Sequence, residues 1–148
     1  MSASADLGFT HIALTCRDAG ATIDFYRRYA GLTPVHDRSD DGARVFWLSD
    51  LRRPFAIVFL ETASPGAPLG PFAHLGVCLE SAETVDALVA EARREGRATS
   101  GPTLSPPPVG YWAFIQDPDG HTLELSFGQE VELHVAAAWA SDGAGEAG

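Results

Sequence analysis

The hydrophobic and polar positions of the chain follow a pattern that occurs twice. The segments "FTHIAL" (9–14) and "FAHLGV" (72–77) align residue for residue, so that His11 and His74 occupy equivalent positions. Both segments are short and apolar, which is typical of buried β-strands. A repeat of this kind predicts two structural modules of the same design.

Each of these strands is followed by a run with helical spacing, residues 18–31 and 81–96. Asp18 and Ser81 are suitable N-cap residues, because a short side chain with an oxygen can accept a hydrogen bond from the first free backbone N–H groups. A glycine stands near the end of each run, where a left-handed cap is favoured. The pattern therefore predicts one helix in each module.

Behind each helix the chain contains three further strand-like runs. They are residues 32–37, 43–49 and 55–61 in the first half, and 97–101, 110–116 and 121–127 in the second. Each half therefore has the order β-α-β-β-β, and the fold class predicted is α+β with curved mixed sheets around a cavity.

The modules span residues 8–62 and 72–128 of a single domain, 1–148, and they are joined by a linker at 63–71. Residues 101–110 are too rich in proline for a strand and predict a stiff loop. The tail at 141–148 is predicted to be disordered.

Alternation along three strands places bulky apolar residues on one face and small or polar residues on the other. The second face carries, in chain order, His11, Ala13 and Thr15; His74, Gly76 and Cys78; and Thr122, Glu124 and Ser126. Small side chains beside polar groups leave room for a ligand.

The ligand-capable residues on these faces are His11, His74 and Glu124. Two imidazoles and a carboxylate suit a divalent metal ion, and three protein ligands leave positions vacant for a substrate. A buried hydrogen-bond network between histidine and glutamate remains the alternative. The metal could be Fe, Mn, Ni, Co or Zn.

Composition limits the function further. The chain has 148 residues, of which 45% are hydrophobic, and its net charge of −10 argues against a nucleic-acid partner. Apolar runs are only as long as strands and the start does not resemble a signal peptide, so we expect no membrane span and a cytoplasmic location. Cys16 and Cys78 are too few for a disulfide framework and predict free thiols.

The segments "HIALTCRDAGATIDFYRRYAGL" (11–32) and "DPDGHTLELSFGQ" (117–129) resemble the vicinal oxygen chelate superfamily. This superfamily includes glyoxalases, bleomycin-resistance proteins, fosfomycin-resistance transferases and extradiol dioxygenases. The resemblance covers residues 8 to about 129. It implies a metal-dependent lyase, isomerase, transferase or dioxygenase whose small-molecule substrate binds the metal through two neighbouring oxygens. The alternative is a bleomycin-resistance-like protein that binds a small molecule without catalysis.

The resemblance also implies metal ligands at His11, His74 and Glu124, and a homodimer. It leaves open whether His11 of one chain joins His74 and Glu124 of the other. The catalytic candidates are Glu124 and, as a proton donor, Tyr111. His121 is a weaker candidate for a general base and is expected to be exposed.

Glyoxalase I-like members have a fourth ligand on the last strand of the first half. The matching position here is Ile57 or Phe59, and both are apolar. Glu61 lies further along on the same face, and its role as a ligand is left open.

Overall fold

The computed structural model describes residues 8–145, which divide into two compact units. One unit contains the chain up to Leu69 together with Asp117–His121. The other contains Gly70–Gln116 and the chain from Thr122 onward. The division follows the predicted repeat, except that a short turn of the second half packs with the first.

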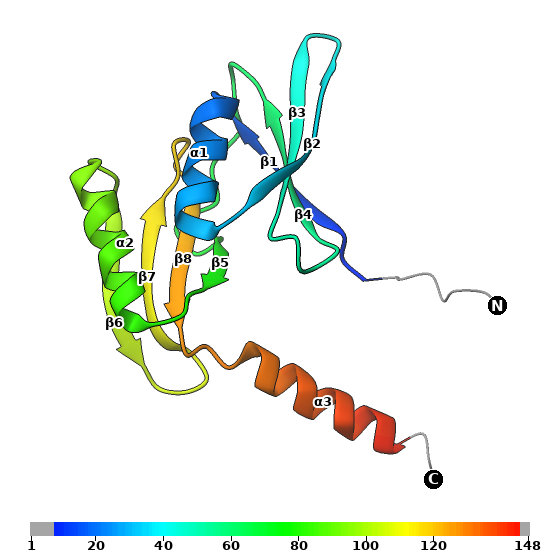
Figure 1. Ribbon diagram of the computed structural model, residues 1–148, viewed down its shortest axis with the longest axis vertical. Helices are drawn as coiled ribbons and strands as arrows, with labels where there is room; N and C mark the ends of the chain where they lie inside the picture. Colours follow the sequence, from blue (N-terminus) through cyan, green and yellow to red (C-terminus); the bar gives the residue numbers. More distant parts are fainter. Residues whose placement is uncertain (1–7, 146–148) are drawn as a thin grey trace, which may run out of the picture. The chain divides into compact units, whose positions relative to one another are not determined.

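The first unit contains one helix and a four-stranded sheet in the order β1-β4-β3-β2 (Figure 1). Strands β1 and β4 run parallel, whereas the other neighbours are antiparallel. The elements are β1 (His11–Cys16), α1 (Ala19–Ala30), β2 (Thr33–Asp40), β3 (Ala43–Ser49) and β4 (Ala56–Glu61).

The second unit repeats this design in the order β5-β8-β7-β6, with β5 and β8 parallel. Its elements are β5 (Leu75–Cys78), α2 (Ala82–Arg94), β6 (Thr99–Ser105), β7 (Gly110–Gln116) and β8 (Thr122–Phe127). The α+β class and the β-α-β-β-β order of each half are therefore confirmed.

The helices begin where the sequence predicts. The Asp18 side chain accepts a hydrogen bond from the Ala21 N–H, and the Ser81 side chain accepts one from the Thr84 N–H. At the end of α1, Gly31 has a φ of 65°, a conformation that L side chains rarely adopt. Capping contributes about 1 kcal/mol at each helix start.

Each helix covers one face of its own sheet. In the first unit, Tyr26 of α1 packs against Phe59 of β4, with ring centroids 5.3 Å apart, and Phe59 stacks on Phe46 at 5.4 Å. In the second unit, α2 buries Val85, Val89 and Ala92 on the face that β7 and β8 line with Ala113, Ile115, Leu123 and Leu125. Each large apolar side chain buried this way contributes about 1.5–3 kcal/mol. Among residues 8–145 the remaining helix, Val131–Gly145, extends away from the sheet of its own unit (Figure 1), so the opposite face of each sheet is not covered by a helix of the same unit.

Strand β6 differs from the prediction, because it includes residues that the proline content assigned to a loop. The pairing of β6 with β7 shifts between Ser100 and Thr103, and Gly101 between them has a φ of 85°. β6 is the edge strand of its sheet, where the missing N–H of Pro102 breaks no central ladder. The bulge and the edge position together accommodate the proline.

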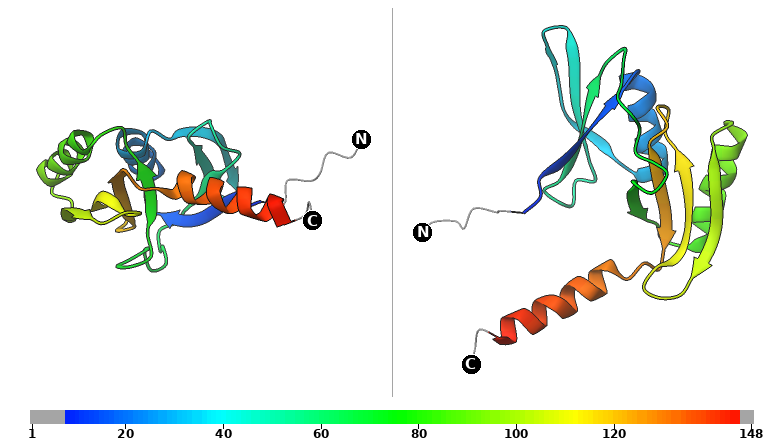
Figure 2. Two further views of the ribbon diagram at one scale, coloured as in Figure 1. Left: turned by 90° about the horizontal axis from the view of Figure 1, so that it is seen from below. Right: turned by 180° about the vertical axis from the view of Figure 1, so that it is seen from behind.

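Helix α3 (Val131–Gly145) is a second difference, because it extends into the tail for which the sequence predicted disorder. Residues 146–148 of that tail lie outside the described residues. The helix extends away from the sheet of its own unit (Figure 2) and exposes Val131, Leu133, Val135 and Trp139. Among residues 8–145, no helix is both long enough and apolar enough to cross a membrane.

The turn between β7 and β8 is fixed by a buried carboxylate. Asp117 accepts hydrogen bonds from the Tyr26 hydroxyl at 2.9 Å, the Asp119 N–H at 2.8 Å and the His121 N–H at 2.9 Å. Burial raises the pKa of this carboxyl above its usual range. The three donors therefore offset part of the cost of placing the carboxylate in the interior.

His121 is buried in the same cluster, with 3% exposure, so the prediction that it is exposed is wrong. Its Nδ1 accepts from the Leu69 N–H at 3.0 Å, which leaves the hydrogen on Nε2 to be donated to the Thr15 carbonyl at 2.8 Å. Both nitrogens are occupied within the protein. His121 is thus a structural residue rather than a general base.

We expect Tyr26→Phe to lower the free energy of unfolding by about 1–3 kcal/mol, because it removes one donor from the buried Asp117 carboxylate. Urea unfolding monitored by circular dichroism measures the change. Tyr111→Phe is the matched control, since its hydroxyl bonds Asp86 in an exposed pair and its loss should cost less than about 0.5 kcal/mol. Equal losses in the two variants would contradict the role given to Asp117.

Candidate metal centre

Two of the three predicted ligands lie together in the second unit. Nε2 of His74 is 3.3 Å from Oε2 of Glu124, and their side chains are 34% and 9% exposed. Glu124 is in β8, opposite Gly76 of β5, while His74 precedes β5 rather than lying within it. A Cβ at Gly76 would stand 3.9 Å from the Glu124 Cβ, an ordinary van der Waals contact, so Gly76 lies directly beside Glu124.

The surroundings orient both groups. Nδ1 of His74 lies 2.7 Å from the Phe72 carbonyl, which can only accept, so Nδ1 carries the hydrogen and Nε2 keeps its lone pair in the neutral ring. Gln129 donates to Oε1 of Glu124 at 3.3 Å, which leaves Oε2 facing His74. A hydrogen bond to the far side of a metal-binding group is the usual way in which proteins fix its orientation.

The facing atoms are therefore a nitrogen lone pair and a carboxylate oxygen. Two acceptors at 3.3 Å repel each other unless a proton or a metal ion lies between them. A divalent metal prefers this donor set, so the residues fit such an ion. A protonated His74 paired with Glu124 is the metal-free arrangement that the same geometry permits.

Aromatic side chains line the region beside this pair. The Phe114 ring lies 5.0 Å from the His74 ring, and Trp112 lies 4.9 Å from Phe114. Phe114 pairs directly with Glu124 across β7 and β8, so these residues share one face of the sheet. Trp112 is held by a hydrogen bond of 2.9 Å from its indole N–H to Ser105.

The third predicted ligand, His11, starts β1 in the first unit and is exposed. Its Nδ1 lies 2.9 Å from the Thr10 hydroxyl, which leaves Nε2 available. Within either unit, residues 8–145 contain no group of three His, Cys, Asp or Glu side chains arranged to hold a metal ion. His74 and Glu124 are thus brought together, whereas His11 is presented separately.

The structure places Tyr111 away from His74 and Glu124. Its hydroxyl donates to Asp86 of α2 at 2.5 Å, so it lies on the helix side of β7. Trp112 and Phe114, which alternate with it, face the other way. Tyr111 is therefore not in position to donate a proton beside His74 and Glu124 within this unit.

Glu61 is occupied by a structural contact. Its Oε2 accepts from the Ala19 N–H at 2.6 Å, where the negative charge opposes the positive end of the α1 dipole. Ile57 pairs with Ile12 and Phe59 with Leu14, so this face of β4 lies under α1. The face beside His11 instead carries Ala56, Val58 and Leu60, which provide no fourth ligand.

The groups that orient the ligands have no distinctive motif in the sequence. Thr10 and Gln129 flank the strands without any distinctive spacing, and the Phe72 partner is a backbone carbonyl. A threonine directly before the first-strand histidine was the only available signal. All three contacts join residues that are close in the sequence, but they depend on side-chain conformation, which the pattern of residue types does not define.

A family model and a bacterial protein match most of this chain. The model of the Glyoxalase/Bleomycin resistance protein/Dioxygenase superfamily matches residues 8–125. The uncharacterized protein PA2024 of Pseudomonas aeruginosa is 32% identical over 125 residues, which cover 82% of this chain and 89% of that protein.

Two solved structures have a similar fold. The fosfomycin resistance protein FosX of Listeria monocytogenes, crystallised with Mn(II), has a TM-score of 0.65 at 20% identity, covering 87% of this chain and 98% of FosX. TnmS3, an antibiotic binding protein from Streptomyces sp. CB03234, has a TM-score of 0.62 at 24% identity, covering 83% and 97%. Superfamily members bind small molecules, and the metal-dependent ones use divalent ions.

The two cysteines should differ sharply in reactivity. Cys78 is exposed at the end of β5, whereas Cys16 is fully buried and burial raises its pKa to about 11. Because the thiolate is the reactive form, a chromogenic disulfide reagent at about pH 8 should label Cys78 alone in the folded protein. Two thiols should react after unfolding in guanidinium. Rapid labelling of the folded Cys78→Ser variant would contradict this assignment.

Proposed function

The chain belongs to the Glyoxalase/Bleomycin resistance protein/Dioxygenase superfamily, and we propose that within it the protein is a metal-dependent enzyme. Its substrate is a small molecule that offers two neighbouring oxygen atoms to a divalent ion. The observation that carries the proposal is the 3.3 Å approach of His74 Nε2 to Glu124 Oε2, with Nδ1 of the same ring held by a carbonyl.

Each residue has a separate task in this proposal. His74 and Glu124 supply two ligands, and His11 supplies the third through its Nε2 atom. A bound divalent ion supplies Lewis-acid stabilisation of negative charge on the substrate oxygens and orients them. Phe72 and Thr10 hold the two imidazoles, while Gln129 holds the carboxylate. Phe114 and Trp112 exclude water beside the ligands.

We further propose that the protein is a homodimer. Superfamily members commonly form dimers, and here each unit contributes only part of the ligand set. A second copy offers a His11 side chain to complete the set, as the first copy does in return. Such an exchange is a symmetric arrangement, in which both sites form together.

Cobalt titration tests the metal site, because the visible absorption of Co²⁺ reports its ligands without a substrate. We expect one ion per chain in the wild-type protein. His11→Ala, His74→Ala and Glu124→Ala should each weaken binding by more than about 100-fold, since loss of an orienting partner alone costs about 10–100-fold.

The matched control is His134→Ala, which removes an exposed histidine of α3 that is paired with Glu130. It should leave Co²⁺ affinity unchanged. Failure of the wild-type protein to take up the ion, or equal affinity in His74→Ala, would reduce the pair to a hydrogen-bonded His–Glu contact and end the proposal.

Mixing variant subunits tests the shared site. A dimer of one His11→Ala chain and one Glu124→Ala chain has one complete ligand set if the chains share sites, and none if each chain builds its own. We therefore expect about one Co²⁺ per mixed dimer, measured after tandem-tag purification. No binding by the mixed dimer would assign each site to a single chain.

The second candidate function is binding of a small molecule without chemistry. The net charge of −10 favours a cationic ligand for such a protein. An aromatic cationic dye that binds the metal-free protein tightly, with the same affinity in His74→Ala, would support this function instead.

A further inference from the structure

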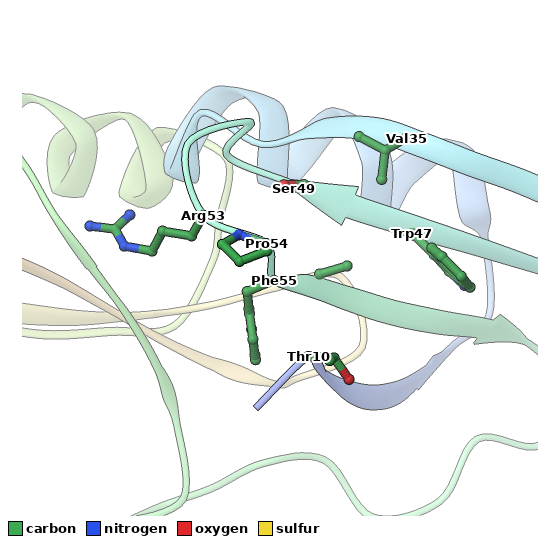
Figure 3. Close-up of a pocket in the computed structure, with 8 residues that line it drawn as sticks. Thr10, Val35, Trp47, Ser49, Arg53, Pro54 and Phe55 are labelled. Carbon is green, nitrogen blue, oxygen red and sulfur yellow. The ribbon is translucent and has the colours of Figure 1, made fainter. Parts of the chain in front are cut away.

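A groove on the first unit lies on the side of the sheet that α1 leaves uncovered. It has a volume of about 310 Å³. Its walls come from the start of β1, from β2 and β3, and from the segment that leads into β4 (Figure 3). The residues that line it include Thr10, Val35, Trp47, Ser49, Phe55 and Ala56.

The groove adjoins the predicted ligand His11. Ala56 is the direct partner of His11 in the parallel pairing of β1 and β4, and neighbouring strands lie about 5 Å apart. Thr10, on the groove wall, is also the residue whose hydroxyl holds Nδ1 of His11. The groove wall at Ala56 therefore lies one strand spacing from the backbone of His11.

The side chains that line the groove are suited to binding a flat aromatic ring. Val35, Trp47 and Phe55 are 47%, 37% and 37% exposed, so three large apolar side chains remain open to solvent around one hollow. The His36 ring packs 4.6 Å from the Trp47 ring and supports it from the side. Flat aromatic walls favour a flat apolar ligand.

The charged side chain on the groove wall does not make the groove a binding site for an anion. Arg53 is paired with Asp50, and in Figure 3 its guanidinium points away from Val35 and Trp47. The hydroxyl of Ser49 is occupied by the Leu51 N–H at 3.1 Å. The neutral apolar surface is therefore what the groove offers to a ligand.

The loop wall is already ordered. The Asp50 carboxylate accepts from the N–H groups of Arg52 at 2.9 Å and Arg53 at 3.0 Å, and these hydrogen bonds lower its pKa. The Ala56 N–H donates to the Thr10 carbonyl at 3.0 Å, joining the end of this loop to β1. Because this loop is ordered before a ligand binds, binding does not incur the entropy cost of ordering the loop.

We propose that this groove holds an aromatic ring of the substrate, attached beside the two oxygens that reach the metal. The inference rests on the proposed function and narrows its substrate to small aromatic molecules with neighbouring oxygens. A cavity of about 150 Å³ suffices for benzene, so the groove has room for one substituted ring.

Mandelate and lactate provide a matched pair of probes, because both present adjacent hydroxyl and carboxylate oxygens and only mandelate carries a ring. Calorimetry on the Co²⁺-loaded protein should give mandelate an affinity about 10–100-fold higher, as burial of a phenyl ring predicts. The Trp47 indole N–H signal should shift on mandelate binding, while the Trp139 signal stays in place.

Trp47→Ala should bring the mandelate affinity down to that of lactate and leave Co²⁺ affinity unchanged. Phe55→Ala is the second variant, should Trp47→Ala not fold. Leu104→Ala is the control, since it shortens an exposed apolar side chain of the other unit. Equal affinities for the two acids, or an unchanged preference in the groove variants, would overturn the inference.

A probe that has an aromatic ring but no neighbouring oxygens distinguishes failure of this inference from failure of the proposed metal site. If the protein binds no Co²⁺ but 4-methylphenol still shifts the Trp47 signal, the groove binds rings and the metal function fails. If Co²⁺ binds and neither ring probe moves that signal, the groove inference fails alone. A Trp47 signal that responds only to protein dilution would assign the groove to a second copy and also overturn the inference.

Discussion

Each sheet of this protein is covered by a single helix of its own unit, and that constraint shapes everything else. Side chains along a strand alternate between faces, so the residues under the helix must be large and apolar. Phe46 and Phe59 meet this need under α1, as Ile115 and Leu125 do under α2. The other face is released from core packing and can carry histidine, glutamate and small residues.

On this uncovered face, hydrogen bonds to neighbouring groups orient the side chains that can bind a ligand. A backbone carbonyl fixes the His74 tautomer, a neighbouring hydroxyl holds His11, and one amide holds Glu124. The result is an imidazole nitrogen 3.3 Å from a carboxylate oxygen, an arrangement that requires either a proton or a metal ion between the two atoms. The same uncovered side of the first sheet has an open aromatic groove, so ligand-capable and apolar groups occur next to each other.

Much of the fold and part of the site could be predicted. Alternation predicts His11 and Glu124 on the faces away from the helices, and the capping pattern predicts both helix starts, whereas His74 precedes β5 and approaches Glu124 from outside the strand. Tyr111 lies on the helix side because it alternates with Trp112 along β7, a relation already present in the sequence. Glu61 shares a face of β4 with Ile57 and Phe59, as alternation predicts, but only the pairing of Ile57 with Ile12 shows that this face lies under α1.

The amino-acid sequence by itself determined the repeated β-α-β-β-β order and the periodic separation of core and free faces, because both depend on local spacing. Only the tertiary structure decided which polar side chains are hydrogen-bonded within the protein. His121 is buried against Thr15 and Leu69, and Pro102 is tolerated at an edge strand. Hydrogen-bond partners distant in the chain leave no periodic signal, so the state of a polar side chain is known only once the fold has brought those partners together.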